Sequence, residues 1–167
     1  RLQLHGTDIC VVSTAFASPP ERHVNVAELA LHRCMRQVEQ GRDVVLLLDS
    51  LTALTRARSR SSAPSGAWIQ PGLDAKSILI AKQVLESARQ CEEGGSLTVI
   101  TSVTTGPPET IDEAIEREFA AFTNSDVVIA REAPSNDATL PFDVHATRTR
   151  AEDDATPESQ RSMVAAL

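Results

Sequence analysis

An apolar run that ends in an acid, "DVVLLLDS" at 43–50, constrains the fold of this chain more than any other stretch. A strand that is apolar at every position is typical of a parallel sheet whose two faces are both covered by helices. A carboxylate beside such a strand is costly to bury unless it holds a partner or a cation. The run therefore predicts a buried parallel strand, and it makes Asp49 a candidate functional group.

Short β-rich runs alternate with segments of helical periodicity along the rest of the sequence. Ser18, followed by Pro and by Glu21, has the pattern of a capping box, and Asp74 can cap a later helix. This alternation predicts one α/β domain over 1–167, with a mostly parallel sheet and helices on both faces. The expected strands are 8–13, 44–48, 97–102, 126–130 and 142–147.

The composition excludes several classes of protein. The chain has 167 residues, of which 41% are apolar and 23% charged, as in soluble globular domains. A net charge of -7 excludes an overall basic face for nucleic acid. No apolar run approaches the roughly 20 residues that span a bilayer. Three widely spaced cysteines indicate unpaired thiols, so we expect a reducing, cytoplasmic location.

Asp49 followed by Ser50 matches the Walker B pattern, in which the carboxylate holds Mg²⁺, usually through water, beside nucleotide phosphates. The alternative is that Asp49 only caps a helix that starts near Leu51. A Walker B residue needs a Walker A loop, GxxxxGK[ST], and this sequence has none. The pattern therefore predicts either a nucleotide site whose first part precedes Arg1, or a protein that does not bind nucleotide in the ordinary way.

Six segments occur in an order that points to one family. They are "VVSTAFASPPERHVNVAELAL", "DVVLLLDSLTALTRA", "PSGAWIQPGLDAKSI", "EEGGSLTVITS", "TIDEAIEREF" and "TRTRAEDD". Together, from about Val11 to Thr156, they resemble the ATPase domain of the Rho family of bacterial transcription termination factors. The resemblance implies a RecA-like P-loop NTPase fold whose N-terminal Walker A part is missing here.

The same resemblance implies a function. Rho-type proteins are hexameric, RNA-dependent ATPases and helicases, so the expected cofactors are ATP and Mg²⁺. The expected partners are RNA and further copies of the chain, with RNA polymerase as another candidate and no membrane. Because half of the nucleotide pocket is absent, we expect the isolated chain to be inactive. Removal of the Walker A strand is also expected to expose sheet edges.

Several site residues follow from the resemblance, position by position. Asp49 is similar to the Walker B acid, and Ser50 beside it is a further candidate cofactor-binding residue. Arg150 matches the arginine finger, a group worth roughly 10³-fold or more in rate, and Arg131 matches a further arginine at the subunit boundary. Leu140 takes the place of the aromatic residue that stacks on adenine. Without the resemblance, both arginines would be interpreted as solvated surface charges.

The two polar loops, 65–72 and 103–111, are similar to the Q-loop and R-loop that touch RNA in the Rho channel. Their usual lysines are replaced by Ala67 and Thr110, and each lost lysine removes one phosphate contact. Trp68 is expected to be a packing anchor more often than an RNA-stacking residue. Flexible polar connection is the alternative for both loops. The candidate RNA-binding residues are Ser65, Gly66, Gly72, Thr104, Thr105 and Gly106.

The sequence thus predicts part of a Rho-type RNA-dependent ATPase and translocase motor. Loss of the loop lysines favours one rival, a degenerate Rho-like domain that is not an enzyme and acts as an interaction or regulatory module. A second rival is another RecA-type ATPase, such as an F1-like or recombinase subunit. The motif "EEGGSLT" and the loop before Ala75 favour Rho over this second rival.

Overall fold

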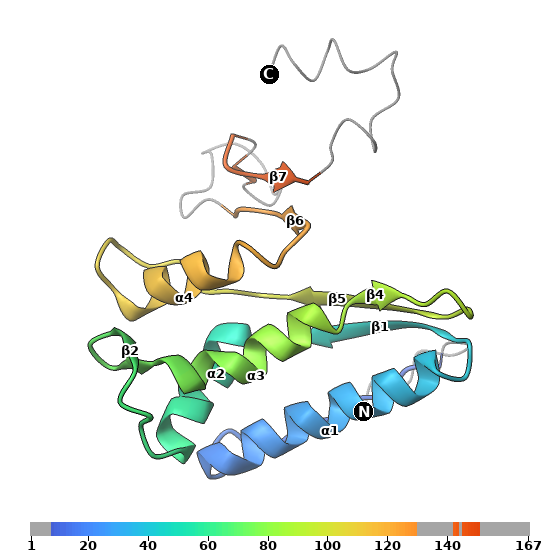
Figure 1. Cartoon of the computed structure of the whole chain (residues 1–167), viewed down its shortest axis with the longest axis horizontal. Helices are drawn as coiled ribbons and strands as arrows, with labels where there is room; N and C mark the ends of the chain where they lie inside the picture. The colour runs from blue at the N-terminus through green and yellow to red at the C-terminus, as the bar shows by residue number, and fades with distance from the viewer. Residues whose placement is uncertain (1–7, 130–141, 144, 151–167) are drawn as a thin grey trace. The chain divides into compact units, whose positions relative to one another are not determined.

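The computed structural model describes residues 8–129, 142–143 and 145–150. Two compact units, Arg1–Phe119 and Ala120–Leu167, divide the chain (Figure 1). The helices and strands of the first unit are α1 (Pro20–Val38), β1 (Asp43–Leu48), α2 (Leu51–Ser61), β2 (Trp68–Gln70), β3 (Leu73–Asp74), α3 (Ala75–Glu86), β4 (Arg89–Gln90), β5 (Ser96–Thr101) and α4 (Ile111–Phe119). The second unit contains β6 (Ser125–Asp126) and β7 (Arg148–Thr149).

A three-stranded sheet in the order β1-β5-β4 forms the centre of the first unit. β1 and β5 are parallel, with Asp43 opposite Ser96 and Leu48 opposite Thr101. Parallel neighbours need a long crossover connection, and α2, the β2–β3 hairpin and α3 supply it. β4 pairs with β5 in the antiparallel direction. The carboxyl ends of β1 and β5 therefore lie next to each other at one edge of the sheet.

The core of the first unit lies between the helices and one face of this sheet. Val44, Leu46 and Leu48 of β1 are partly buried and pack against the core cluster. The most deeply buried side chains include Ile115 and Phe119 of α4, which are 0% and 1% exposed. Full burial of side chains of this size stabilises a fold by about 1.5–3 kcal/mol each. α1, α2, α3 and α4 all contribute residues to this one cluster.

The other face of the two parallel strands is open. Val45 is 60% exposed, Leu47 71% and Ile100 56%. Alternate side chains of a strand point to opposite faces, and within the described part of the first unit no segment closely covers the face on which these three lie. The expectation that the run 43–50 is buried on both faces is therefore wrong for the described residues.

The segment before α1 also differs from expectation. Residues 8–13 form no strand, and Ile9 and Val11 are 51% and 65% exposed. A strand needs a neighbour for its N–H and C=O groups, and the described residues pair none with this segment. α1 begins at Pro20 with Pro19 as N-cap, so the predicted Ser18 capping box is not formed. Proline suits the first helical position because it has no N–H to leave unpaired.

The strands of the second unit differ from the prediction. Of the expected strand 126–130, only Asp126 lies in β6, and the described residues of the expected strand 142–147 form no named strand, because β7 begins after them at Arg148. Ser125 pairs with Thr149, and Asp126 pairs with Arg148, in antiparallel register. The Nε of Arg148 also donates to Oδ2 of Asp126 at 2.7 Å. An isolated bridge joins Ile129 to Phe142, which lies within the two predicted strands.

Gly95 fixes the place where the α1–β1 connection meets β5. Its φ is +84°, and a Cβ at this position would lie 2.6 Å from the carbonyl oxygen of Val38 and 2.9 Å from that of Arg42. The N–H of Ser96 donates to the same Arg42 oxygen at 3.2 Å. A side chain at position 95 therefore has no room, which gives a physical reason for the second glycine of "EEGGSLT".

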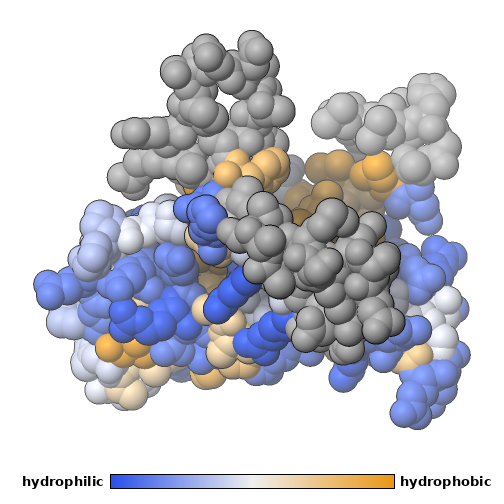
Figure 2. Space-filling model, turned by 90° about the horizontal axis from the view of Figure 1, so that it is seen from above, coloured by the Kyte–Doolittle hydropathy of each residue, from blue (hydrophilic) through white to orange (hydrophobic). Residues whose placement is uncertain are grey.

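Hydrophilic residues make up most of the coloured surface in Figure 2, and apolar residues emerge between them in separate patches. Across the described ranges, none of the helices combines the length and the apolar character needed to cross a bilayer.

Candidate nucleotide site and its two loops

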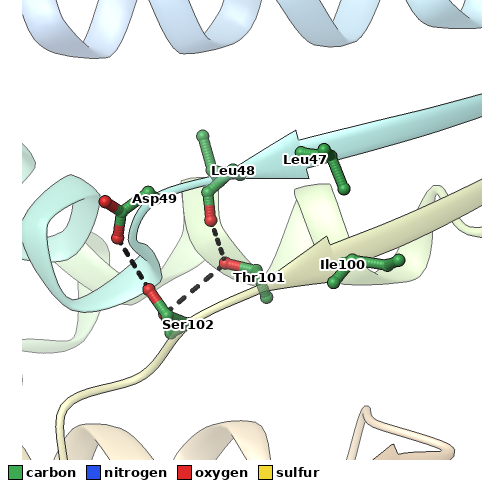
Figure 3. Close-up of a pocket in the computed structure, with 6 residues that line it drawn as sticks. All are labelled: Leu47, Leu48, Asp49, Ile100, Thr101 and Ser102. Atoms are coloured by element: carbon green, nitrogen blue, oxygen red, sulfur yellow. Dashed lines mark hydrogen bonds between the residues drawn. The ribbon is translucent and has the colours of Figure 1, made fainter.

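Asp49 and Ser102 meet at the carboxyl ends of β1 and β5 (Figure 3). The hydroxyl of Ser102 donates to Oδ1 of Asp49 at 2.8 Å. The carbonyl oxygen of Ser102 accepts from the N–H of Leu51 at 3.0 Å, which ties the start of α2 to the end of β5. The hydroxyl of Thr101 donates to the carbonyl oxygen of Leu48 at 2.8 Å. These bonds fix the carboxylate in the crevice where open parallel sheets bind ligands.

An open hollow of about 330 Å³ lies over these strand ends. Leu47 and Ile100 form its apolar part, and Asp49 and Ser102 form its polar end. Figure 3 shows the apolar and polar side chains following one another along the two strands. The apolar wall of this hollow is open to solvent, and Asp49 and Ser102 are the groups in its lining that can hydrogen-bond a ligand.

Ser50, and not Asp49, caps the following helix. The hydroxyl oxygen of Ser50 accepts from the N–H of Ala53 at 3.1 Å, in the geometry of an N-cap. The alternative interpretation of Asp49 as a helix cap is therefore wrong. In the described part of the chain, Oδ2 of Asp49 has no hydrogen-bond partner, so this oxygen is available to a ligand.

The donors around Asp49 fit a magnesium ion that keeps most of its water. Among the described residues, no group of three or more His, Cys, Asp or Glu side chains could enclose a metal. Mg²⁺ is usually bound by one or two carboxylates together with waters and substrate phosphates, not by an all-protein cage. A single carboxylate beside the Ser102 hydroxyl is consistent with that kind of site.

The first loop is a hairpin held by a buried carboxylate. Asp74 is 4% exposed, and its oxygens accept from the N–H of Ser65 at 2.7 Å and from the Ser65 hydroxyl at 2.8 Å. The N–H of Lys76 donates to Oδ1 of Asp74 at 2.9 Å, so the predicted cap of α3 is confirmed. Both donors of Ser65 are therefore used inside the hairpin.

These bonds set the charge state of the carboxyl group. Burial raises the pKa of Asp74, but the hydrogen bonds from Ser65, Lys76 and Gly66 outweigh it, and the net pKa is lowered from its ordinary value. Asp74 is thus a stable anion at neutral pH. A buried anion with several short hydrogen bonds holds the turn at Ser65 and Gly66 in one conformation.

The second loop, 103–111, follows Ser102 directly and is fixed at both ends. Near its start, the N–H of Thr104 donates to the hydroxyl oxygen of Thr52 at 2.9 Å. Near its end, Glu109 has a φ of +65°, and its N–H donates to a carboxylate oxygen of Glu113 at 2.6 Å. Few non-glycine residues adopt this left-handed conformation, and the Glu113 bond stabilises it here.

The structure brings the two loops together through Gln70. Its Nε2 donates to the carbonyl oxygen of Glu109 at 2.6 Å. A Cβ at Gly72 would lie 3.1 Å from Cδ1 of Ile111, so the hairpin also lies against the start of α4. No pattern in the sequence singles out Gln70 or Glu109, because an amide and a carbonyl that lie far apart in the chain leave no local signal.

The candidate RNA-binding residues occupy different places in these loops. Gly66 and Gly72 have φ values of +87° and +89° and shape the hairpin. Thr104 and Thr105 are exposed, while Gly106 is half-buried and packs against Thr110. Their role in RNA binding stays a prediction.

Trp68 differs from its predicted role. Its side chain is 55% exposed, so the expectation that it is a packing anchor is wrong. Ile69, the next residue, is 38% exposed.

The remaining site residues belong to the second unit. The guanidinium of Arg150 donates to the carbonyl oxygens of Ala120 and Ala121 at 3.2 and 2.8 Å. Arg150 therefore has a local partner, and its role as an arginine finger stays a prediction. Arg131 and Leu140 lie outside the described residues.

Comparison with curated proteins gives several Rho factors, although no family model matches the chain. The chain is 38% identical over 143 residues to transcription termination factor Rho of Mycobacterium bovis, covering 86% of this chain and 24% of that protein. It is 39% identical over 143 residues to Rho of Cereibacter sphaeroides, covering 86% of this chain and 34% of that protein. The predicted resemblance is confirmed. The chain is also 35% identical over 148 residues to Rho of Bacillus subtilis, and it spans 35% of that protein.

Solved structures show the same fold at lower identity. A prototypical ATPase of the type III secretion system of pathogenic bacteria superposes with a TM-score of 0.77 at 21% identity, covering 91% of this chain and 44% of that one. The ATPase EscN, assembled with its central stalk EscO from enteropathogenic E. coli, gives 0.73 at 21% identity, covering 91% of this chain and 36% of that one. The predicted fold class, part of a RecA-like P-loop NTPase, is confirmed.

Proposed function

We propose that this chain is the Walker B part of a Rho-type, RNA-dependent ATPase motor. The observation that carries the proposal is Asp49, which lies at the end of a parallel strand, is oriented by Ser102 and is not used as a helix cap. Identity of 38% to a Rho factor over 86% of the chain supports the same function. The structural neighbours are only 21% identical and support the fold alone, so a Rho-type motor ranks above other RecA-type ATPases.

In this proposal, each element has a separate task. Asp49 holds a water of the Mg²⁺ shell through its Oδ2, while Ser102 keeps the carboxylate in one orientation. Bound Mg²⁺ supplies the positive charge that neutralises the phosphates during ATP hydrolysis. The loops 65–72 and 103–111 contact RNA, and the second of them directly follows Ser102. Because this residue bonds Asp49, the nucleotide site and the RNA-contacting loop share one strand end.

A ring of six copies is the proposed working form, with ATP at the subunit boundaries and a cytoplasmic location. Arg150 acts there on the ATP of the neighbouring subunit. To do so, its guanidinium has to exchange the carbonyl oxygens of Ala120 and Ala121 for phosphate oxygens, which bind a guanidinium more strongly. Arg131 and Leu140 complete the proposed boundary site, and RNA polymerase is a further proposed partner.

The test is ATP hydrolysis by the product of the longest reading frame that encodes this sequence, with and without single-stranded RNA. Asp49→Asn should reduce the RNA-stimulated rate by about 100-fold or more, because it removes the charge that holds the metal. Asp43→Asn is the matched control. Asp43 lies at the opposite end of β1 and accepts from Ser96 at 2.7 Å, so its loss should leave the rate within about twofold of wild type.

Two results would overturn the proposal. Hydrolysis that RNA does not stimulate, or that survives Asp49→Asn, would exclude a Rho-type Walker B role. Complementation tests the arginine: a mixture of Asp49→Asn and Arg150→Ala subunits should regain activity at mixed boundaries, whereas neither variant alone is active. The 167-residue chain by itself should show no turnover, because its sequence has no Walker A loop.

The second candidate function is a Rho-like interaction or regulatory module without enzyme activity. The loops favour it, because 65–72 and 103–111 contain neither Lys nor Arg. A complete protein that fails to hydrolyse ATP under all conditions would support this function over the motor.

A further inference from the structure

Trp68 presents an exposed aromatic ring on a loop, 65–72, that contains no lysine or arginine. It is the only tryptophan in the sequence, which also has no tyrosine. Its side chain is 55% exposed at the start of β2. Burial of a large aromatic side chain stabilises a protein. Because the Trp68 ring stays half-exposed on a well-formed hairpin, the folded chain does not gain the full stabilisation that its burial would give.

The hairpin holds this ring in a defined place. The N–H of Ala75 donates to the carbonyl oxygen of Ala67, the residue before Trp68, at 2.8 Å. Asp74 accepts from Ser65 on one side, and Gln70 donates to Glu109 on the other. Because the backbone is bonded on both sides of Trp68, a ligand that stacks on the ring does not first have to order the loop.

The charges around the ring disfavour phosphate as the contact. The two loops contain no Lys or Arg, and the nearest cations along the chain from the hairpin are Arg60 and Lys76. Arg56 approaches the second loop, but its guanidinium pairs with Asp112 at 2.6 Å. Glu109 adds negative charge near the hairpin, and the charge of Glu113 is paired with Arg117 at 2.6 Å. Stacking on a ring, in contrast, needs no positive charge, since every base has an apolar face.

We propose that Trp68 is a base-stacking residue for single-stranded RNA, presented by a hairpin that Gln70 and Asp74 lock in place. The proposal rests on the proposed function for the identity of the ligand. In this site, the aromatic face replaces the phosphate contacts that lysines would make. Binding is therefore governed by bases and depends only weakly on salt, because few counterions are released.

The test uses the 167-residue chain and a 12-nucleotide oligocytidylate RNA with a fluorescent label. Label anisotropy reports binding, while Trp68 reports stacking through its fluorescence and its single indole N–H resonance. RNA should quench the fluorescence and shift the resonance, and an abasic oligomer of equal length and charge should do neither. Trp68→Ala should weaken binding by roughly 5- to 150-fold, the range for loss of one stacked base, and Trp68→Phe should retain most of the affinity.

Salt dependence gives a second readout. The slope of log K against log salt should be no steeper than about -0.7, which corresponds to one phosphate contact on a single strand. Gln70→Glu keeps the size of the side chain but removes the donor to Glu109, and it should weaken RNA binding and broaden the Trp68 resonance. Gln83→Glu, on the exposed face of α3, is the control for added charge and should change neither.

The outcomes separate this proposal from the proposed function. If labelled RNA binds while Trp68 is unaffected, or if the abasic oligomer acts equally, base stacking is wrong and RNA binding stands. If no RNA binds to the chain or to the complete protein, the RNA-dependent motor fails and this proposal fails with it. A change in Trp68 fluorescence that follows protein concentration without RNA would identify a second copy of the chain as the occupant, and would also overturn the proposal.

Discussion

Gly95 offers the sharpest test of how this fold is held together. One added methyl group there would clash with backbone atoms, which cannot change rotamer as a side chain can. In Gly95→Ala, the new Cβ would lie 2.6 Å from the carbonyl oxygen of Val38 and 2.9 Å from that of Arg42. The first oxygen belongs to the last residue of α1, and the second belongs to the connection between α1 and β1. Relief requires β5 to move away from this connection, which would lengthen the bond from Ser96 to Arg42.

Two costs add in this variant. An alanine at a φ of +84° costs about 1–2 kcal/mol because its Cβ approaches its own backbone. Forcing a methyl group into a filled space typically costs a further 1–3 kcal/mol. The free energy of unfolding should therefore fall by about 2–5 kcal/mol.

Gly41→Ala separates the two costs. Gly41 has a similar φ of +79°, and a Cβ there would meet nothing within 4 Å. It should lose only the backbone part, about 1–2 kcal/mol. Urea unfolding of the 167-residue chain, followed by far-ultraviolet circular dichroism, measures both variants against wild type. Equal losses in the two variants would refute the crowding argument, and so would a Gly95→Ala protein as stable as wild type.

Two further predictions concern single hydrogen-bonding groups. The pKa of Asp74 is lowered in the folded chain, so its stabilising contribution is complete above the pKa of an unfolded aspartate and is lost as the pH falls through the lower folded value. Urea midpoints measured from pH 7 down to below about pH 4 should fall less steeply for Asp74→Asn than for wild type, and parallel curves would contradict this. Ser50→Ala should lose about 1 kcal/mol of unfolding free energy, because the N–H of Ala53 loses its cap. Ser50→Asn should lose much less in the same urea titration, since Asn also caps helices well, and equal losses would show that the cap contributes nothing.

Local signals in the sequence predicted the elements that carry the site. The apolar run before Asp49, the cap at Asp74 and the run at 97–102 each depend on neighbouring residues, and each formed within a residue or two of the expected bounds. The rule that parallel strands end at one edge of the sheet explains why Asp49 lies beside Ser102.

What the sequence missed depends on distant neighbours. Val45 and Leu47 are exposed because no other segment of their unit covers their face of the sheet. The apolar pattern of the strand predicts that this face is suited to burial, but it does not show whether a segment that covers it is present. The bond between Gln70 and Glu109 joins residues 39 positions apart. The strand expected at 8–13 has suitable residues but no paired neighbour among the described residues. In each case, the deciding partner lies far along the chain.

Because β1 is buried on one face only, tolerance to substitution along this strand should alternate from one residue to the next. Polar substitutions at Val44 or Leu46 disturb packing inside the unit and should lower its unfolding free energy. The same substitutions at Val45 or Leu47 replace side chains that already face water, and should leave the isolated chain equally stable and more soluble. In a longer protein that covers this face, those two positions would become intolerant as well. A deep mutational scan of six residues, made once in the chain and once in the longer protein, would therefore map where the rest of the protein lies against this sheet.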